Sequence, residues 1–279
     1  MKKTLALLAI LIFSVVGVAL GIRAAYAWTQ RAPLPISECR VHSPWGFADS
    51  QQTLRPICRQ GYLSAYDERA KIPAYVAYTL TPANALGCVA RTDAFVADAS
   101  VPNGPRPDDY ANTGFDKGHA APDGDLSWDQ QVEYESFLMT NMFPQHGSLN
   151  RGIWKLLETS IRGWAVQQNT TYTIYTGAIY GNDNPRIGRG VVVPNAFYKI
   201  VVNHRDGTFA GWQFPHTAPY QNLGNNLTRF RVPVAQIQRT AGISFEFPAN
   251  AKELNPGQEW PVDFGALTNA KRQKCGRDE

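Results

Sequence analysis

His119 stands in a segment whose composition suits a reactive loop. From Thr113 to Asp123 the chain reads Thr-Gly-Phe-Asp-Lys-Gly-His-Ala-Ala-Pro-Asp, which combines glycine, proline and ionisable side chains. An imidazole titrates near neutral pH, so His119 can accept a proton from water or from a hydroxyl group. Gly118 lets the backbone pass close to a ligand. A lone histidine is more often structural than catalytic, so this segment alone indicates only a candidate general base.

The apolar residues that follow Asn150 recur at the spacing of a helix face. Trp154, Leu157 and Ile161 stand at positions i, i+3 and i+7. This pattern predicts a helix over about residues 150–163 with one apolar stripe that faces the core.

Two polar side chains of this helix, Asn150 and Glu158, have both a functional and a structural interpretation. Successive helix residues are about 100° apart, which separates these two by about 80° around the axis and lets both border one cleft. As structural features, Asn150 is an N-cap and Glu158 forms an i,i+4 ion pair with Arg162. The geometry permits the functional interpretation without requiring it.

Three motifs, in their order and spacing, resemble the active-site signature of a nuclease family. They read Asp116-Lys-Gly-His119-Ala-Ala-Pro, Thr140-Asn141-Met-Phe-Pro-Gln, and Leu149-Asn150-Arg-Gly-Ile-Trp-Lys-Leu-Leu-Glu158. The family is that of the DNA/RNA non-specific endonucleases, a branch of the ββα-metal nucleases related to mitochondrial endonuclease G. Weaker similarity extends over about residues 55–245.

Residue by residue, the resemblance implies a catalytic centre built around His119. In this interpretation His119 is the general base, and Asn150 is the one direct protein ligand of a Mg²⁺ ion. Glu158 then holds waters of that ion.

The same resemblance implies supporting roles for four further residues. Asn141 orients the site, while Arg162 and Arg91 contact phosphate. The match at Arg91 rests only on an Arg-Thr-Asp tripeptide and on its distance from His119. Lys117 stands where the family usually has arginine, so a planar, bidentate phosphate contact is replaced by a point charge on a flexible stem.

These residue types suit the hydrolysis of a phosphodiester bond. A neutral histidine accepts a proton from water, and Mg²⁺ takes oxygen ligands, keeps several waters and stabilises developing negative charge. The resemblance implies an endonuclease that cleaves both DNA and RNA and leaves 5′-phosphate ends. Binding through the phosphate backbone does not read bases, and no small-molecule cofactor is implied. Mn²⁺ is an alternative ion, because one amide ligand selects weakly.

A local basic track is a further candidate for phosphate binding. Arg151, Lys155 and Arg162 would contribute from the predicted helix, and Arg186-Ile-Gly-Arg189 from a loop. Such residues are also common on solvated surfaces.

Two other functions stay open at this stage. Asp116, Asp123 and Asp125 could act as paired carboxylates of a glycosidase, but this leaves the polar residues of the other motifs without roles. A non-enzymatic alternative is an exported nucleic-acid-binding or uptake protein that has the nuclease fold and weak or no activity. The intact histidine and asparagine of the motifs favour the enzyme.

The candidate site residues must be positioned by strands and helices, and the predicted strands and helices do not alternate regularly along the chain. This order predicts an α+β fold with a mixed or antiparallel sheet core. The strands, rich in β-branched and aromatic residues, are predicted at 74–81, 171–176, 196–202 and 208–214. The helices are predicted at about 126–137, where Asp125 could cap the helix, at 150–163, and at 232–241 ahead of Gly242.

Without repeats or long linkers, residues 28–279 are expected to form one endonuclease domain that carries the ββα-metal motif. The oligomeric state is left open.

The four cysteines allow three disulfide connectivities. We favour Cys39–Cys58, which closes a local loop, and Cys88–Cys275, which ties the C-terminus to the body. Zinc is disfavoured because no C-x-x-C or C-x-x-H spacing occurs.

The first 27 residues are typical of a cleaved signal peptide. Lys2 and Lys3 precede an apolar run that ends at Ile22, and Ala25-Tyr-Ala27 matches a cleavage site. This pattern predicts an exported protein, periplasmic or secreted. The run is also just long enough for an uncleaved membrane anchor, which is the alternative. Three of the 27 Lys and Arg residues lie here, against 23 acidic residues in the chain, so the remainder is nearly neutral and is not a strongly cationic nucleic-acid binder.

Overall fold

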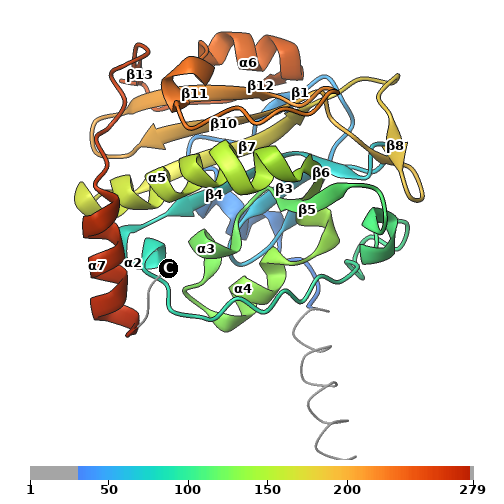
Figure 1. Ribbon diagram of the computed structural model, residues 1–279, viewed down its shortest axis with the longest axis horizontal. Helices are drawn as coiled ribbons and strands as arrows, with labels where there is room; N and C mark the ends of the chain where they lie inside the picture. The colour runs from blue at the N-terminus through green and yellow to red at the C-terminus, as the bar shows by residue number, and fades with distance from the viewer. Residues whose placement is uncertain (1–30, 277–279) are drawn as a thin grey trace, which may run out of the picture.

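A seven-stranded sheet forms the centre of the computed structural model, which describes residues 31–276 (Figure 1). The strands lie in the order β13, β11, β10, β7, β4, β3, β2, and all neighbours are antiparallel except β13, which is parallel to β11. Their bounds are β2 Arg55–Cys58, β3 Leu63–Asp67, β4 Ile72–Leu80, β7 Tyr172–Ile179, β10 Ala196–Asn203, β11 Thr208–Pro215 and β13 Lys252–Glu253. The α+β class with a mixed sheet is therefore confirmed. The segment 1–27 lies outside the described residues.

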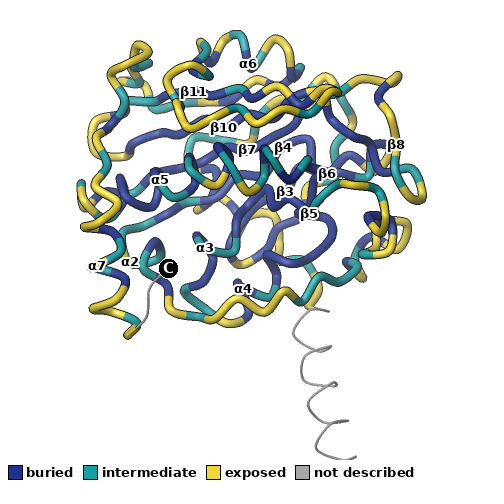
Figure 2. The backbone as a smooth tube through the Cα atoms, in the orientation of Figure 1, coloured by how far each residue is buried: buried dark blue, intermediate teal, exposed yellow. Residues whose placement is uncertain are grey.

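The four strands predicted from the sequence are β4, β7, β10 and β11. Each is dominated by β-branched, aromatic and small apolar residues; β4, β7 and β10 are buried over most of their length, and β11 over half of its length. Because β4, β7 and β10 occupy the middle of the sheet, both of their faces are covered, and their burial is nearly continuous in Figure 2.

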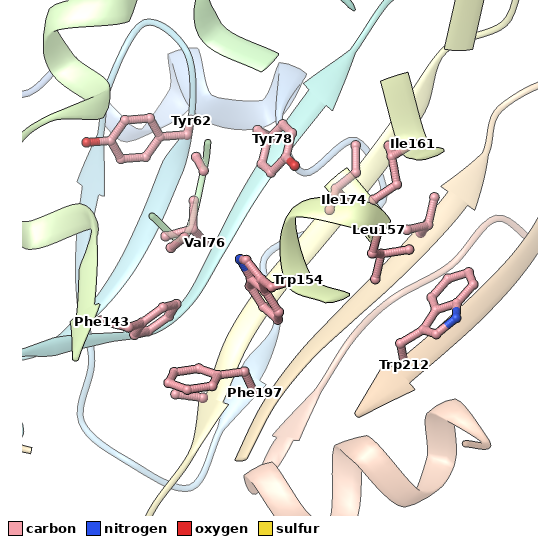
Figure 3. Close-up of a cluster of buried hydrophobic side chains, with 14 of the residues drawn as sticks. Tyr62, Val76, Tyr78, Phe143, Trp154, Leu157, Ile161, Ile174, Phe197 and Trp212 are labelled. Atoms are coloured by element: carbon pink, nitrogen blue, oxygen red, sulfur yellow. The ribbon is translucent and has the colours of Figure 1, made fainter. Parts of the chain in front are cut away.

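Two hydrophobic layers lie on opposite faces of this sheet. Helix α5, Lys155–Gln167, packs on one face, where Phe197 and Val201 of β10 join its apolar stripe. Figure 3 shows this layer, with Trp154, Leu157 and Ile161 directed toward the strands. Helix α6, Val234–Ala241, packs on the other face, where alternate residues of β10 point, namely Tyr198, Ile200 and Val202.

A two-stranded ribbon precedes α5 and completes a ββα unit. Strand β5, Phe115–His119, pairs antiparallel with β6, Met142–His146, and His119 is opposite Met142 at the end of the ribbon. A six-residue π-helical segment, η4, Leu149–Trp154, then leads into α5. The ribbon and helix thus bring the three sequence motifs to one place (Figure 1).

The single helix predicted over about 126–137 is instead two short helices. Helix α3 spans Asp123–Leu126 and α4 spans Gln130–Ser136. Asp129, whose carboxylate accepts from two backbone N–H groups, caps α4. Asp125 is not the cap that we expected, because its carboxylate accepts hydrogen bonds from two buried side chains, those of Tyr78 and Arg162. The predicted helix at 232–241 is confirmed as α6, which ends at Gly242 with φ of 66°.

The remaining elements are short, apart from the C-terminal helix α7. They are η1 Ile36–Val41, β1 Asp49–Ser50, α2 Pro82–Ala85, η2 Pro107–Tyr110, η3 Met139–Asn141, β8 Arg186–Ile187, β9 Val191–Val192, η5 Leu227–Phe230, β12 Ile243–Ser244 and α7 Phe264–Cys275. None of the helices in residues 31–276 has the length and apolar character needed to cross a membrane.

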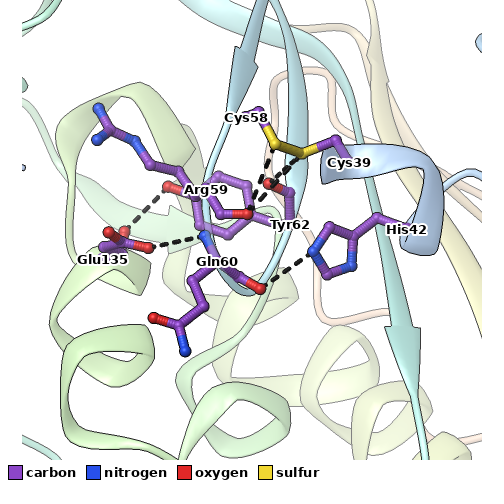
Figure 4. The surroundings of a disulfide bond; sticks show 7 residues. All are labelled: Cys39, His42, Cys58, Arg59, Gln60, Tyr62 and Glu135. Carbon is purple, nitrogen blue, oxygen red and sulfur yellow. Dashed lines mark hydrogen bonds between the residues drawn. A yellow bond between two sulfur atoms is a disulfide. The ribbon is translucent and has the colours of Figure 1, made fainter. Parts of the chain in front are cut away.

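Both favoured disulfides, Cys39–Cys58 and Cys88–Cys275, are present. Cys39 and Cys58 are buried, and their surroundings are hydrogen-bonded across the chain, as Figure 4 shows. The ring of His42 bonds to the carbonyl of Gln60, whose N–H donates to Glu135. The second bridge joins residues 187 positions apart, so it ties the end of the chain to the body as expected.

Candidate active site

Six of the seven residues singled out in the sequence line one cleft of about 500 Å³. They are Arg91, Lys117, His119, Asn150, Glu158 and Arg162. The cleft lies where the end of β5, the segment η4 and the first turns of α5 meet. The tertiary structure therefore brings together residues from three separate motifs.

His119 is buried among aromatic rings at the wall of this cleft. Its ring packs edge-on against Phe137, with centroids 4.9 Å apart, and is tilted against Phe95 at 5.7 Å. Its Nε2 has no hydrogen-bond partner among the described residues. Burial, and then the nearby charge of Arg91, lower the pKa of His119 to about 3. The imidazole is therefore neutral at pH 7 and able to accept a proton, and an anion bound beside it would raise its pKa.

The same two aromatic rings support two cations of the cleft. Lys117 Nζ lies 4.8 Å from the centroid of Phe95, and the Arg91 guanidinium lies 4.9 Å from the centroid of Phe137. Arg91 is also bonded to Asp93 and Asp123. His119, Lys117 and Arg91 are thus arranged around one pair of phenylalanines.

Asn150 lies inside the π-helical segment and is not a helix N-cap. Ser148 precedes this segment, and the backbone at Gly152 leaves helical geometry with φ of −100° and ψ of −118°. The Asn150 Nδ2 donates to Asp116 at 3.0 Å, and the same carboxylate accepts from Arg151. Because the amide nitrogen is held by a carboxylate, the amide oxygen is the atom left to serve as a ligand. π-Helical turns within helices are frequent at functional sites.

Gly118 is required by a close approach within the ribbon. A Cβ atom at this position would lie 1.9 Å from the side-chain Oε1 of Gln145 on the paired strand. Any larger residue would have to displace the buried side chain of Gln145. This explains in steric terms why glycine precedes the histidine.

Glu158 lies on a buried lysine. Its Oε1 is 3.6 Å from Lys199 Nζ, which donates to Thr176 at 2.9 Å and lies 4.4 Å from the ring centroid of Trp154. Burial raises the pKa of Glu158 to about 7, and Lys199 opposes that rise. Burial lowers the pKa of Lys199, and Glu158 opposes that change. The two groups are thus coupled beneath the cleft.

The sequence contained a signal for Lys199 that motif analysis missed. Lys199 stands in the strand segment Ala-Phe-Tyr-Lys-Ile-Val-Val, and period-two alternation places it on the same face as Phe197 and Val201. A lysine on the buried face of a central strand requires a charged partner, and here that partner is Glu158.

Arg162 extends along the floor of the cleft to Asp125. Its Nη1 donates to Asp125 at 2.8 Å, and the hydroxyl of Tyr78 donates to the other oxygen at 2.8 Å. The expected surface pair between Glu158 and Arg162 is thus replaced by two buried pairs that each reach another element. Sequence spacing within one helix could not show these partners.

Asn141, the seventh predicted residue, lies behind the cleft and not in its lining. Its side chain accepts from the backbone N–H of Ala121 and donates to the carbonyls of Ala121 and Ser136. Its own backbone carbonyl accepts from Ala120. Asn141 therefore holds the two residues that follow His119.

The proposed basic track divides into two parts. Arg151 and Lys155 line the cleft, as does Arg162. Arg186 lines a different pocket beside Arg69, and Arg189 is paired with Asp109. The loop Arg186–Arg189 is thus not part of the cleft lining.

The donor set of the cleft fits a hard, water-rich cation. An amide oxygen of Asn150 and a carboxylate of Glu158 are oxygen donors of the kind that Mg²⁺ accepts. Among the described residues no cluster of three or more His, Cys, Asp and Glu side chains could hold a metal ion. A metal at this site would therefore rest on few protein atoms and several waters.

The comparisons with known proteins agree with this arrangement. Residues 46–252 match the model of the family described as DNA/RNA non-specific endonuclease. This chain belongs to that family. The resemblance drawn from the three motifs is therefore confirmed.

Curated relatives share about the same part of the chain. "Nuclease 1, mitochondrial" of Schizosaccharomyces pombe is 30% identical over 207 residues, which cover 66% of this chain and 63% of that protein. "Nuclease C1" of Cunninghamella echinulata is 30% identical over 67% of this chain and 81% of its own length. Human "Endonuclease G, mitochondrial" is 27% identical, with coverages of 67% and 68%. The chain thus spans less than two thirds of the S. pombe relative.

A solved structure has a similar fold. A chain in the crystal structure of an EndoG/EndoGI complex superposes with a TM-score of 0.66 and 27% identity. The superposition covers 75% of this chain and 91% of that one.

The prediction of an exported, periplasmic or secreted protein is contradicted by these relatives. The relatives from S. pombe and Saccharomyces cerevisiae and the two human relatives are named as mitochondrial, which points to mitochondria and not to export. The prediction rested only on the composition of an apolar N-terminal run behind basic residues, in a segment that lies outside the described residues.

Proposed function

We propose that this protein is an endonuclease that hydrolyses phosphodiester bonds of DNA and RNA with one Mg²⁺ ion and leaves 5′-phosphate ends. The observation that carries the proposal is the position of neutral, buried His119 in one cleft with Asn150, Glu158 and several cations. Family membership supports the reaction class. We also propose that the described residues belong to a single endonuclease domain.

His119 is the general base in this proposal. Its imidazole accepts a proton from the attacking water, since it is neutral and its Nε2 has no other partner in the described part of the chain. Asn141 acts as a positioning residue, because it fixes the backbone that follows His119.

Asn150 and Glu158 would hold the metal ion. Asn150 offers its amide oxygen, because Asp116 holds the amide nitrogen. Glu158 accepts hydrogen bonds from waters around the ion, and Lys199 keeps its carboxylate oriented. When bound, Mg²⁺ supplies positive charge that stabilises the negatively charged transition state. Mn²⁺ would satisfy the same oxygen donors.

The cations of the cleft bind the phosphate groups of the substrate. Lys117 and Arg91 lie beside the rings that hold His119, so a phosphate bound to them would be next to the base. Arg162 lies deeper, with Asp125 fixing its direction. Because these contacts go to phosphate and not to base edges, both DNA and RNA are expected substrates.

The test compares the wild-type protein with His119→Ala. Supercoiled plasmid and end-labelled RNA are incubated with Mg²⁺ or with EDTA, and 5′ ends are assayed by kinase labelling before and after phosphatase treatment. We expect metal-dependent cutting by the wild-type protein, ends that label only after phosphatase, and little cutting by the variant. Binding without cutting would support the non-enzymatic alternative and overturn the proposal.

A further inference from the structure

The C-terminal helix α7 reaches the active-site cleft although it lies outside the family match. The match ends at residue 252, and α7 spans Phe264–Cys275. Leu267, Lys271 and Cys275 are four residues apart and form one stripe of this helix. Leu267 is buried, and Lys271 lines the cleft together with His119.

The segment before α7 is firmly attached along α5. Trp260 packs against Trp164 and Tyr172, with ring centroids 5.1 and 5.2 Å apart. Val262 crosses α5 at Gly163, where a Cβ atom would lie only 2.4 Å from the valine methyl group. This attachment fixes the point from which α7 starts.

The first residues of α7 are held to the end of α5. The backbone N–H of Asp263 donates to the side chain of Gln167 at 2.9 Å, and the Gln167 amide donates back to the Asp263 carbonyl at 2.5 Å. The Asp263 carboxylate accepts from Ala266 and caps the helix. Helix α7 is thus an ordered part of the α5 layer (Figure 1).

The other end of α7 is joined covalently to the opposite wall of the cleft. Cys275 forms a disulfide with Cys88, and Val89 and Arg91, which follow Cys88, both line the cleft. Lys274 donates to the carbonyl of Ala83 nearby. The disulfide therefore determines the distance between α7 and the loop that carries Arg91. Cys88 is solvent-exposed, so a reductant can reach the bridge.

Lys271 is suited to bind an anion in the cleft. Only 6% of its surface is exposed, and it is one of the residues that line the cleft. An ammonium group offers N–H donors and positive charge, which are the features that bind phosphate oxygens. Lys271 faces the same space as Arg91 and Lys117, which are the cations next to the general base.

We propose that Lys271 is a phosphate-binding residue of this cleft and that the Cys88–Cys275 disulfide holds it in place. The ligand is a phosphate group of the nucleic-acid strand, so the inference rests on the proposed function. The endonuclease core thereby gains a substrate contact from a helix outside the family match.

The first test compares Lys271→Gln with Lys274→Gln, a matched control on the same helix that donates to the Ala83 carbonyl. Binding of a fluorescent single-stranded DNA is measured in EDTA at several salt concentrations, and kcat and KM are measured with Mg²⁺. For Lys271→Gln we expect Kd and KM to rise about 5- to 10-fold, kcat to stay within about 2-fold, and the salt slope to fall by about 0.7. Lys274→Gln should stay within about 2-fold of wild type, and Lys271→Arg should retain most affinity.

The outcomes separate this proposal from the proposed function. Equal Kd values and salt slopes for the two glutamine variants, in a protein that cuts, would overturn the role of Lys271 alone. A wild-type protein that binds through Lys271 but never cuts would overturn the endonuclease activity alone.

The second test addresses the disulfide. Wild-type protein and Lys271→Gln are each measured with and without reductant, and Cys88→Ser/Cys275→Ser provides a permanently open form, all well below their melting temperatures. We expect reduction to raise the Kd of the wild-type protein several-fold and to have little further effect on Lys271→Gln, because both changes remove the same contact. Fully additive effects would show that the bridge acts independently of Lys271 and would overturn that part of the proposal.

Discussion

The two faces of the central sheet bury different chemistry. On the α5 face the buried side chains include two ion pairs, Lys199 with Glu158 and Arg162 with Asp125. On the α6 face the corresponding layer is apolar and aromatic, with Phe245 packed against three tyrosines, Tyr75, Tyr175 and Tyr198. Strand β10 contributes to both, because Tyr198 and Lys199 are neighbours in sequence and point to opposite faces.

This difference shows that the buried charges and the purely apolar packing lie on opposite faces of the sheet. Buried charges contribute little or unfavourably to stability compared with well-packed apolar groups. The charges occur on the face that holds the cleft, where a substrate phosphate and a cation would interact with them. The hydrophobic layer on the α6 face consists of apolar and aromatic side chains, so its packing serves stability alone.

The largest expected effect is on cleavage when His119, the proposed general base, is replaced. His119→Ala should lower kcat by about 10²- to 10⁴-fold, because no other described residue of the cleft is a histidine. Metal affinity should be retained, since His119 is not a proposed ligand. Steady-state kinetics and calorimetric Mg²⁺ titration check both points, and near wild-type turnover at pH 7 would remove His119 from the mechanism.

Breaking the Lys199–Glu158 pair should affect both stability and activity. Lys199→Met leaves Glu158 buried without its cation, with an expected loss of about 3–5 kcal/mol of unfolding free energy. The pKa of Glu158 should then rise above 7. On acidification, the variant should therefore lose activity that needs the ionised carboxylate at a higher pH than the wild-type protein does.

A second substitution separates the two effects. Lys199→Met/Glu158→Gln should regain much of the stability, because no unpaired charge is left, but it should not regain cleavage. Urea unfolding and pH–rate profiles measure these outcomes. A double variant that cuts as well as the wild-type protein would show that the pair is purely structural.

The matched substitution on the α6 face should affect stability alone. Phe245→Ala removes a buried ring from its contacts with Tyr75, Tyr175 and Tyr198 and should cost about 3–5 kcal/mol. At a temperature where the variant is folded, its kcat should stay within about 2-fold of wild type. A loss of kcat as large as that of Lys199→Met would erase the distinction between the faces.

Acid should destabilise the protein through His119. Its pKa is about 3 in the folded state and near 6.5 when unfolded. Between these values the unfolded chain binds the proton and the folded one does not. Stability therefore falls as pH drops from about 6.5 toward 3, by at most about 1.4 kcal/mol per pH unit. Urea unfolding at several pH values should show a shallower decline in His119→Ala, and equal slopes would mean that folding does not lower the pKa of His119.

The smallest effects are expected at Lys117, a residue of β5 that lines the cleft. Lys117→Arg should preserve or improve kcat/KM, because a guanidinium keeps the charge and adds bidentate geometry. Lys117→Gln should lower kcat/KM and weaken its salt dependence. If both variants equal wild type within about 0.5 kcal/mol, Lys117 does not contact phosphate.

Local features of the fold were predictable because their causes are local. Strands β4, β7, β10 and β11 followed from runs of β-branched and aromatic residues, and α6 ended at the glycine that marked its end. The prediction of one helix over 126–137 was wrong in its start and its continuity, because α3 ends at Leu126 and α4 begins at Gln130 behind an Asp129 cap. A single apolar pattern did not reveal that interruption.

The sequence by itself determined the family and the set of candidate residues, because its three motifs carry the family resemblance. It did not determine their partners. That Arg162 pairs with Asp125, that Lys199 lies under Glu158, and that Lys271 enters the cleft were decided by the tertiary structure. These contacts join residues far apart in the chain, and only the folded sheet and its covering helices set the distances between them.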